Sequence, residues 1–95
     1  MVVGVLKLVL LLPANRSLKG KRSVVNSIKS RIAHRFNVSV VEAADLDSLH
    51  KISLGVVQAG NDRSHVDRSL REVARFIRDL HLARSGEESY CFDNY

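Results

Sequence analysis

The sequence contains a single cysteine, Cys91, among its 95 residues, and this scarcity excludes several classes of protein. One thiol cannot form an internal disulfide, and it cannot supply a zinc site built from several cysteines. A chain without disulfides suits a reducing compartment, so we expect a cytoplasmic protein. Cys91 is also a poor candidate for a catalytic nucleophile, because Glu87, Glu88 and Asp93 lie near it in the sequence and negative charge opposes thiolate formation.

Long apolar runs, metal-binding patterns and phosphate-binding loops are equally scarce. The apolar run of residues 2–12 is interrupted by Lys7, is too short to span a bilayer and lacks the features of a signal peptide. The four histidines are scattered, and none has the close spacing of a metal site. Residues 18–21 contain one glycine and lack the spacing of a P-loop. We therefore expect no metal, no cofactor, no membrane partner and no enzymatic activity.

Aromatic residues are few, with two Tyr, three Phe and no Trp. The apolar segments at residues 2–12 and 52–59, which we predict below to be strands, contain none of them. RNA-binding domains that read single strands stack bases on aromatic side chains of their central strands. We therefore do not expect this mode of RNA binding.

No aspartate or glutamate occurs before Glu42, so the charge is distributed unevenly along the chain. Residues 1–41 carry eight Lys or Arg and no acid, a net charge of +8. Residues 42–95 carry seven basic and ten acidic groups, a net charge of −3, which leaves +5 overall. Such asymmetry favours a polyanionic partner such as a nucleic acid.

Positive charge is concentrated in residues 16–22, where the apolar run gives way to a helix-periodic stretch. Four of these seven side chains are cationic, although the helix dipole makes positive charge unfavourable at a helix start. One interpretation is an anion site, in which the cations, a capping serine and free N–H groups bind phosphate or a nucleic-acid backbone. The candidate residues are Arg16, Ser17, Lys19, Lys21 and Arg22.

A second interpretation of the same segment is internal neutralisation. In the fold predicted below, the polar segment at residues 45–50 lies at the same end of the domain as residues 13–17. Asp45 and Asp47 would then pair with Arg16 and Lys19 within the protein. Long Lys and Arg stems can also cover the edges of a core. Pairing of the two aspartates would remove the reason for an anion site.

The hydrophobic pattern predicts six elements in one domain that spans residues 1–95. The strands are residues 2–12, 38–44, 52–59 and 89–95; one helix covers residues 18–36, and another runs from a cap at Asp62 or Ser64 to Gly86. This order matches the ferredoxin-like βαββαβ sandwich, an α+β fold. We expect a four-stranded antiparallel sheet in the order 4-1-3-2 with two helices on one face.

The predicted core combines the inward residues of the strands with one stripe of each helix. Its members are Leu6, Leu8, Leu10, Leu18, Val25, Ile28, Ile32, Phe36, Val66, Leu70, Val73 and Ile77, with the inward residues of the second and third strands.

The first strand is mostly apolar on both faces, whereas a sheet covered on one side should show alternation of apolar and polar residues. Its outward residues include Val3, Val5, Val9 and Leu11. An exposed apolar face of this kind marks an interface, so we expect a homo-oligomer that associates through these four residues. The alternatives are a misassigned face or partial cover by the C-terminal residues.

Three segments resemble one bacterial family: residues 16–22, the sequence Phe-Asn-Val-Ser-Val at residues 36–40, and Asn61-Asp62 ahead of an amphipathic helix. Together they resemble the YlxP-like bacterial proteins of unknown function, over nearly the whole chain. The resemblance implies a compact ferredoxin-like domain. In many bacteria the family's gene lies among those for transcription and translation factors, which implies work on RNA or the ribosome. No catalytic residues are established for the family, so the resemblance supplies none.

The leading functional hypothesis is a non-enzymatic accessory protein that binds structured RNA or the ribosome through backbone phosphates. The rival is a homo-oligomeric protein-interaction module that uses its apolar sheet face and has no nucleic-acid role. A third hypothesis is a small-molecule regulatory domain.

Overall fold

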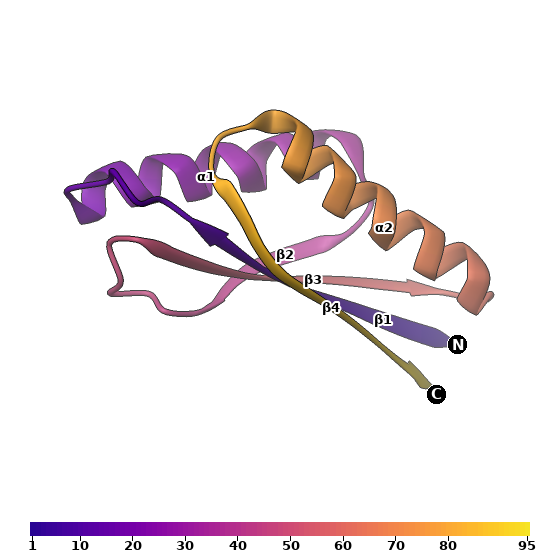
Figure 1. The fold of residues 1–95 in the computed structure, drawn as a ribbon. Coiled ribbons are helices and arrows are strands. Elements are labelled where there is room, and N and C mark those ends of the chain that lie inside the picture. The colour runs from indigo at the N-terminus through magenta and orange to yellow at the C-terminus, as the bar shows by residue number, and fades with distance from the viewer.

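The computed structural model describes residues 1–95 and contains four strands and two helices (Figure 1). In chain order they are β1 (Val2–Leu11), α1 (Leu18–Arg35), β2 (Ser39–Ala44), β3 (Lys51–Gly60), α2 (Arg63–Leu80) and β4 (Arg84–Asn94). The predicted order of elements is confirmed. Neither helix is long and apolar enough to cross a membrane.

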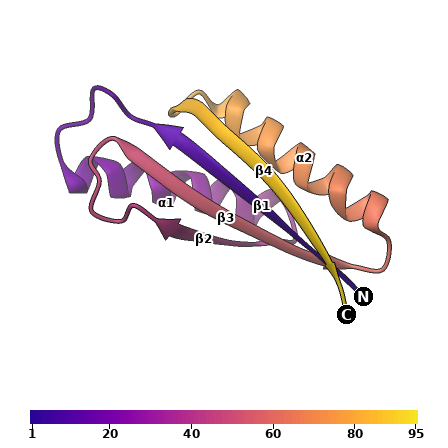
Figure 2. The ribbon, with the colours of Figure 1, turned by 60° about the horizontal axis from the view of Figure 1, so that its bottom comes forward.

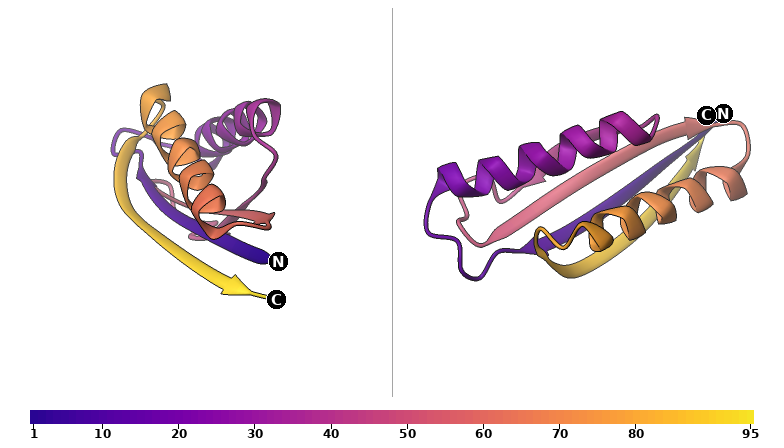
Figure 3. Two further views of the ribbon diagram at one scale, coloured as in Figure 1. Left: turned by 90° about the vertical axis from the view of Figure 1, so that its right-hand side faces the viewer. Right: turned by 90° about the horizontal axis from the view of Figure 1, so that it is seen from above.

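The four strands form one antiparallel sheet in the order β2-β3-β1-β4, which is the predicted 4-1-3-2 counted from the other edge. Both helices lie on the same face of the twisted sheet, and no element covers the opposite face (Figures 1 and 3). From above, α1 runs along the β2–β3 side and α2 along the β1–β4 side (Figure 3). The ferredoxin-like arrangement is therefore confirmed.

The core lies between the sheet and the helices, as the alternating burial of β1 shows. Leu6, Leu8 and Leu10 are at most 3% exposed and meet the inward stripes of both helices. The predicted core is confirmed except at its margin, where Leu18 and Phe36 are only half-buried. Phe36 instead packs edge-on against Phe76, with ring centroids 5.5 Å apart.

The C-terminal third differs from the prediction in where α2 ends and β4 begins. The helix ends at Leu80 and not at Gly86, because His81 adopts the left-handed conformation (φ 53°) that usually falls to glycine at this position. The last strand consequently begins at Arg84 and has 11 residues. Gly86 lies within β4 beside β1, where a Cβ atom would stand 2.8 Å from the carbonyl oxygen of Val9. A glycine is needed there for close approach of two backbones.

The two ends of the chain meet at one end of the sheet (Figure 2). The Met1 amino group donates to the carbonyl of Tyr95 at 3.0 Å, and the Tyr95 N–H donates to the carbonyl of Met1 at 2.8 Å. The β1–α1 loop and the β2–β3 hairpin lie at the other end, where the basic segment begins (Figure 2).

Candidate functional site

The loop before α1 is fixed to the β2–β3 hairpin by Asn15. Its side-chain amide donates to the carbonyls of Ser17 at 2.8 Å and Leu49 at 2.7 Å. Its own carbonyl lies 2.9 Å from Nε2 of His50 and can only accept there. These bonds reach across about 35 residues of sequence and hold the start of α1 in a defined place.

Ser17 is the N-cap of α1, and its Oγ accepts from the N–H of Gly20 at 3.0 Å. A Cβ atom at Gly20 would stand 2.6 Å from Oδ1 of Asn15 and 3.1 Å from Oγ of Ser17. The glycine therefore lets the loop and the cap approach the first turn closely. The backbone N–H groups of Leu18 and Lys19 make no hydrogen bond within the protein and remain available at this end.

Lys21 does not belong to the exposed part of the segment, so its place in the predicted anion site was wrong. Its side chain is 1% exposed and lies on the inward stripe of α1, four residues before Val25. The ammonium nitrogen is 3.0 Å from Oε2 of Glu42 and donates to the carbonyl of Asp45 at 2.5 Å. Lys21 thus links α1 to β2 and to the turn that follows it.

The other three cations of the segment, Arg16, Lys19 and Arg22, are exposed and have no carboxylate within salt-bridge distance. The predicted neutralisation by Asp45 and Asp47 was therefore wrong. Four ion pairs occur in the molecule, and the only one that involves this segment is the buried pair of Lys21. The segment keeps an uncompensated positive surface around the free N–H groups of the helix start.

Asp45 is committed to contacts within its own hairpin. Its Oδ2 accepts from the hydroxyl of Ser53 at 2.5 Å and lies 3.6 Å from the ammonium of Lys51. The Ser53 hydrogen bond, together with the positive charges of Lys51 and Lys21, lowers the pKa of Asp45 below its ordinary value, against some desolvation. The residue also adopts a left-handed conformation (φ 58°), which turns its carbonyl toward Lys21.

Positive charge continues along α1 beyond its first turn. The helix contains no acidic residue, and Lys29, Arg31 and Arg35 form no salt bridge. Arg31 donates to Oγ of Ser27 at 3.2 Å, and the guanidinium of Arg35 lies 5.1 Å from the ring centroid of Phe76. Sequence reasoning missed these three residues as part of one surface, although the lack of acid before Glu42 was the signal.

The outward side of the sheet forms an open face that is largely apolar. Val3, Val5, Val9 and Leu11 lie on it and are half-buried only by their neighbours on the sheet. Exposed apolar side chains continue it on the two strands beyond, with Val57 37% and Val41 52% exposed. The prediction that β1 has a second apolar face is confirmed, and the interface remains a proposal.

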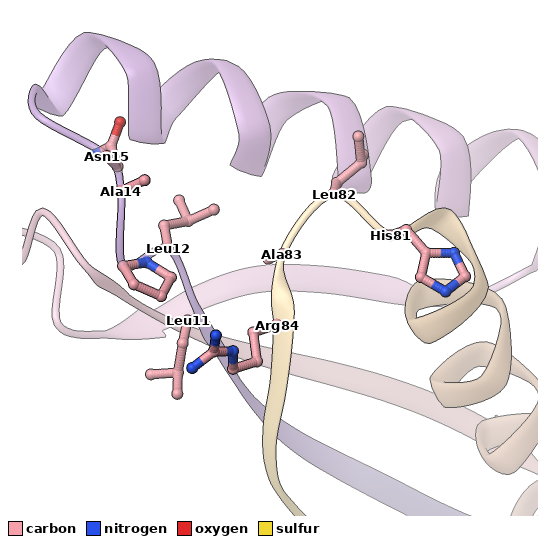
Figure 4. A pocket seen from close by; sticks show the side chains of 9 residues that line it. Leu11, Leu12, Ala14, Asn15, His81, Leu82, Ala83 and Arg84 are labelled. Carbon is pink, nitrogen blue, oxygen red and sulfur yellow. The ribbon is translucent and has the colours of Figure 1, made fainter.

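A shallow pocket of about 540 Å³ separates the β1–α1 loop from the α2–β4 connection (Figure 4). Leu12 and Leu82 point toward α1 in this view, and the guanidinium of Arg84 lies beside Leu11. The lining includes one imidazole, His81, and no carboxylate, hydroxyl or thiol. It therefore offers no pair of nucleophile and base. No group of three or more His, Cys, Asp or Glu side chains is placed to hold a metal.

These features define a small ferredoxin-like domain with two distinctive surfaces, a cationic helix and an open apolar sheet face. The chain belongs to the DUF503 family, described as proteins of unknown function, whose model matches residues 3–87. It is 34% identical over 61 residues to the uncharacterized protein YlxP of Bacillus subtilis (strain 168), which covers 64% of this chain and 66% of that protein. The match thus spans slightly less than two thirds of that relative. The predicted family resemblance is confirmed.

Two solved structures share the topology. One is a dimeric protein of unknown function and ferredoxin-like fold from Bacteroides fragilis NCTC 9343, with a TM-score of 0.53 and 14% identity over 99% of this chain and 96% of that one. The other is SnoaB, a cofactor-independent oxygenase from Streptomyces nogalater, with a TM-score of 0.45 and 12% identity over 99% of this chain and 92% of that one. The first likeness shows the fold alone, and the second carries no argument about function.

Proposed function

We propose that this domain is a non-enzymatic, RNA- or ribosome-associated factor that contacts phosphates through the exposed side of α1. The contacts come from Arg16, Lys19 and Arg22 around the helix start, with the hydroxyl of Ser17 and the free N–H groups of the first turn. Lys21 has a structural role in this proposal and does not touch the ligand.

One observation supports the proposal above all others. The three cations are exposed without a carboxylate partner, although the chain has ten acidic residues and uses one of them for Lys21 in the same segment. Positive charge that is left unpaired at the positive end of a helix dipole costs stability, and a bound phosphate would offset that cost. The remaining cations of α1 extend the surface along a helix of about 27 Å, which suits a backbone of regularly spaced phosphates.

The same surface favours structured RNA over single strands. The open face of β1 and β3 carries no aromatic side chain on which bases could stack. Contacts to phosphates position a protein on a duplex without reading its sequence. We therefore expect binding with little sequence preference and a steep loss of affinity with salt, with a log–log slope of roughly −2 to −3 for three contacts.

The test is binding of the intact protein to ribosomal subunits and to a generic duplex RNA over a series of salt concentrations. A triple variant with Arg16, Lys19 and Arg22 changed to Gln should lose most of the affinity and the salt dependence. The matched control changes Arg68, Arg75 and Arg84 to Gln, which removes the same charge from exposed residues that form no salt bridge. The proposal fails if the wild type binds neither RNA nor ribosomal subunits, or if the two triple variants lose equal affinity.

The open sheet face supports a second candidate role, that of a protein-interaction module. A contiguous apolar surface on a small soluble domain marks an interaction site. The Bacteroides protein of similar fold is dimeric, which makes a second copy of the chain a reasonable partner. This role is independent of the charge on α1, because the two surfaces lie on opposite sides of the sheet (Figure 1).

A further inference from the structure

The open sheet face consists of rows that cross the strands at each outward residue of β1. Lys7 occupies the middle of the five rows, with Val3 and Val5 on one side and Val9 and Leu11 on the other. In the middle row, Lys7 pairs with Gly55 on β3 and with Ser89 on β4, and Gly55 pairs with Val41 on β2. The face therefore has one charged side chain at its centre and a glycine directly beside it.

We propose that a second copy of this chain covers the open face, related by a two-fold axis parallel to the strands, so that Lys7 of each copy lies over Gly55 of the other. The inference rests on the second candidate role and adds the partner and its orientation. It is independent of RNA binding by α1.

The size of the face suits a dimer. Strands of ten residues are about 33 Å long, and four strands spaced about 4.8 Å apart are about 19 Å wide. Face-to-face packing then covers about 600 Å² on each copy, or about 1,200 Å² in total, which is the lower limit of stable specific interfaces. A two-fold axis also gives a closed assembly, in which the same patch serves both copies.

The position of Lys7 selects the direction of the axis. A two-fold axis perpendicular to the strands through the middle row would stack Lys7 on Lys7 and bury two like charges together. An axis parallel to the strands exchanges β1 with β3, so each outward residue of β1 lies over its own register partner in the other copy. Val5 then meets Val57, and Lys7 meets Gly55. From there the stem of Lys7 can cross Val41 to the short edge strand β2 and keep its ammonium in water.

Gly55 is otherwise unexplained within one copy of the chain. Its φ is not positive, so the backbone does not require glycine. A Cβ atom would be 3.5 Å from Val41 and 3.6 Å from Ala43, which are ordinary contacts. By contrast, Cβ atoms at Gly4 and Gly60 would stand within 2.7 Å of Val66. A glycine in the interior of a central strand weakens it and marks close approach of another group, and the partner's Lys7 supplies that group.

The first test fills the position over which the partner side chain lies. Gly55→Phe points into the open face and should leave each copy folded, as far-ultraviolet circular dichroism would show. It should weaken dimerisation by about tenfold or more in sedimentation velocity, because overpacking at a fitted surface is unfavourable. The matched control is Ser30→Phe, which adds the same side chain to the exposed side of α1 and should leave dimerisation unchanged.

The second test measures orientation by cross-linking in a Cys91→Ser background, which removes the only native thiol. A bismaleimide that spans the roughly 10 Å between packed sheets should join a Lys7→Cys chain to a Gly55→Cys chain and should not join two Lys7→Cys chains. A wild type that sediments as a monomer at high micromolar concentration overturns both the interaction role and the inference. A dimer that tolerates Gly55→Phe, or that cross-links Lys7→Cys to itself, overturns the orientation and leaves self-association intact.

Discussion

Lys21 shows how a single residue can be misjudged from its chemical type alone. It lies four residues before Val25 and seven before Ile28, which is the spacing of the buried stripe, yet its charge suggested a place on the surface. The helical period was the correct signal, because the interior supplies a partner. That partner, Glu42, lies 21 residues away, and no local pattern in the sequence indicates the pairing.

We expect Lys21→Met to destabilise the domain by about 3–5 kcal/mol, because it leaves the largely buried carboxylate of Glu42 without its counter-charge. Removing both charges in Lys21→Met/Glu42→Leu should restore most of the loss, since replacing a buried ion pair by apolar side chains is often neutral. Urea unfolding of the variants measures both effects. Lys19→Met, an exposed neighbour, should change the free energy of unfolding by less than about 0.5 kcal/mol. A small cost for the single change at Lys21 would contradict the structural role.

Tyr90 gives a pH dependence with a defined sign. Burial, reinforced by the hydrogen bond that its hydroxyl donates to Glu88 at 3.0 Å and by the charge of that carboxylate, raises its pKa from 10.0 to about 12. A pKa that is higher in the folded state stabilises the fold below the unfolded value, and that contribution is lost as the pH rises from about 10 toward 12.

The measurement is an ultraviolet titration of the Tyr95→Phe variant, in which Tyr90 is the only tyrosine. We expect phenolate to form with a midpoint near 12 in the folded protein and near 10 after unfolding in urea. Equal midpoints in the two states would contradict the contact between Tyr90 and Glu88. Tyr90→Phe is the control, because it should lose the high-pH transition.

At the scale of elements, the β1–α1 loop and the first turn of α1 are built as one unit. Gly20 stands at an interior helical position, where alanine would ordinarily be about 1 kcal/mol better. The close approach of Asn15 and the Ser17 cap reverses this preference, because a Cβ atom would stand 2.6 Å from the Asn15 side chain. The sequence shows the glycine but not the asparagine that requires it.

We therefore expect Gly20→Ala to destabilise the domain by about 1 kcal/mol, the size of a lost cap or hydrogen bond. In an Asn15→Ala background, the same substitution should become neutral or favourable, because the obstructing oxygen is gone. A double-mutant cycle by thermal or urea unfolding measures this change of sign. Additive effects of the two substitutions would show that Gly20 and Asn15 are not coupled.

Elements were predictable from the sequence where hydrophobic periodicity decided them, and less so where one local turn did. The period-two pattern of β1 and the helical stripes of α1 and α2 indicated the order of strands and nearly all of the core. The end of α2 was misplaced because His81 takes a conformation that glycine usually takes, and Gly86 serves a close contact between strands. The exposed cations could be identified from sequence, whereas the choice of Glu42 over the two aspartates could not.

At the scale of the whole molecule, the two distinctive surfaces lie on opposite sides of the sheet. If a second copy covers the open face, the helices form the two outer layers of a four-layer assembly, and each outer layer presents one cationic α1. Such a dimer would carry two phosphate-binding surfaces that point away from each other. Linking two sites in one particle raises the apparent affinity for a ligand that can engage both, without any new contact.

This arrangement predicts that Gly55→Phe, which should separate the copies, weakens binding to a long or folded RNA but not to a short duplex. A duplex of roughly 27 Å, the length of α1, can engage only one copy, so its affinity should be the same for monomer and dimer. Fluorescence anisotropy with the two RNAs, at one salt concentration and with Ser30→Phe as control, measures the difference. Equal weakening for both RNAs would show that dimerisation alters the α1 surface itself, and unchanged binding to both would show that a single copy makes all the contacts. Loss of affinity for the long RNA alone is the result that joins the two surfaces in one function.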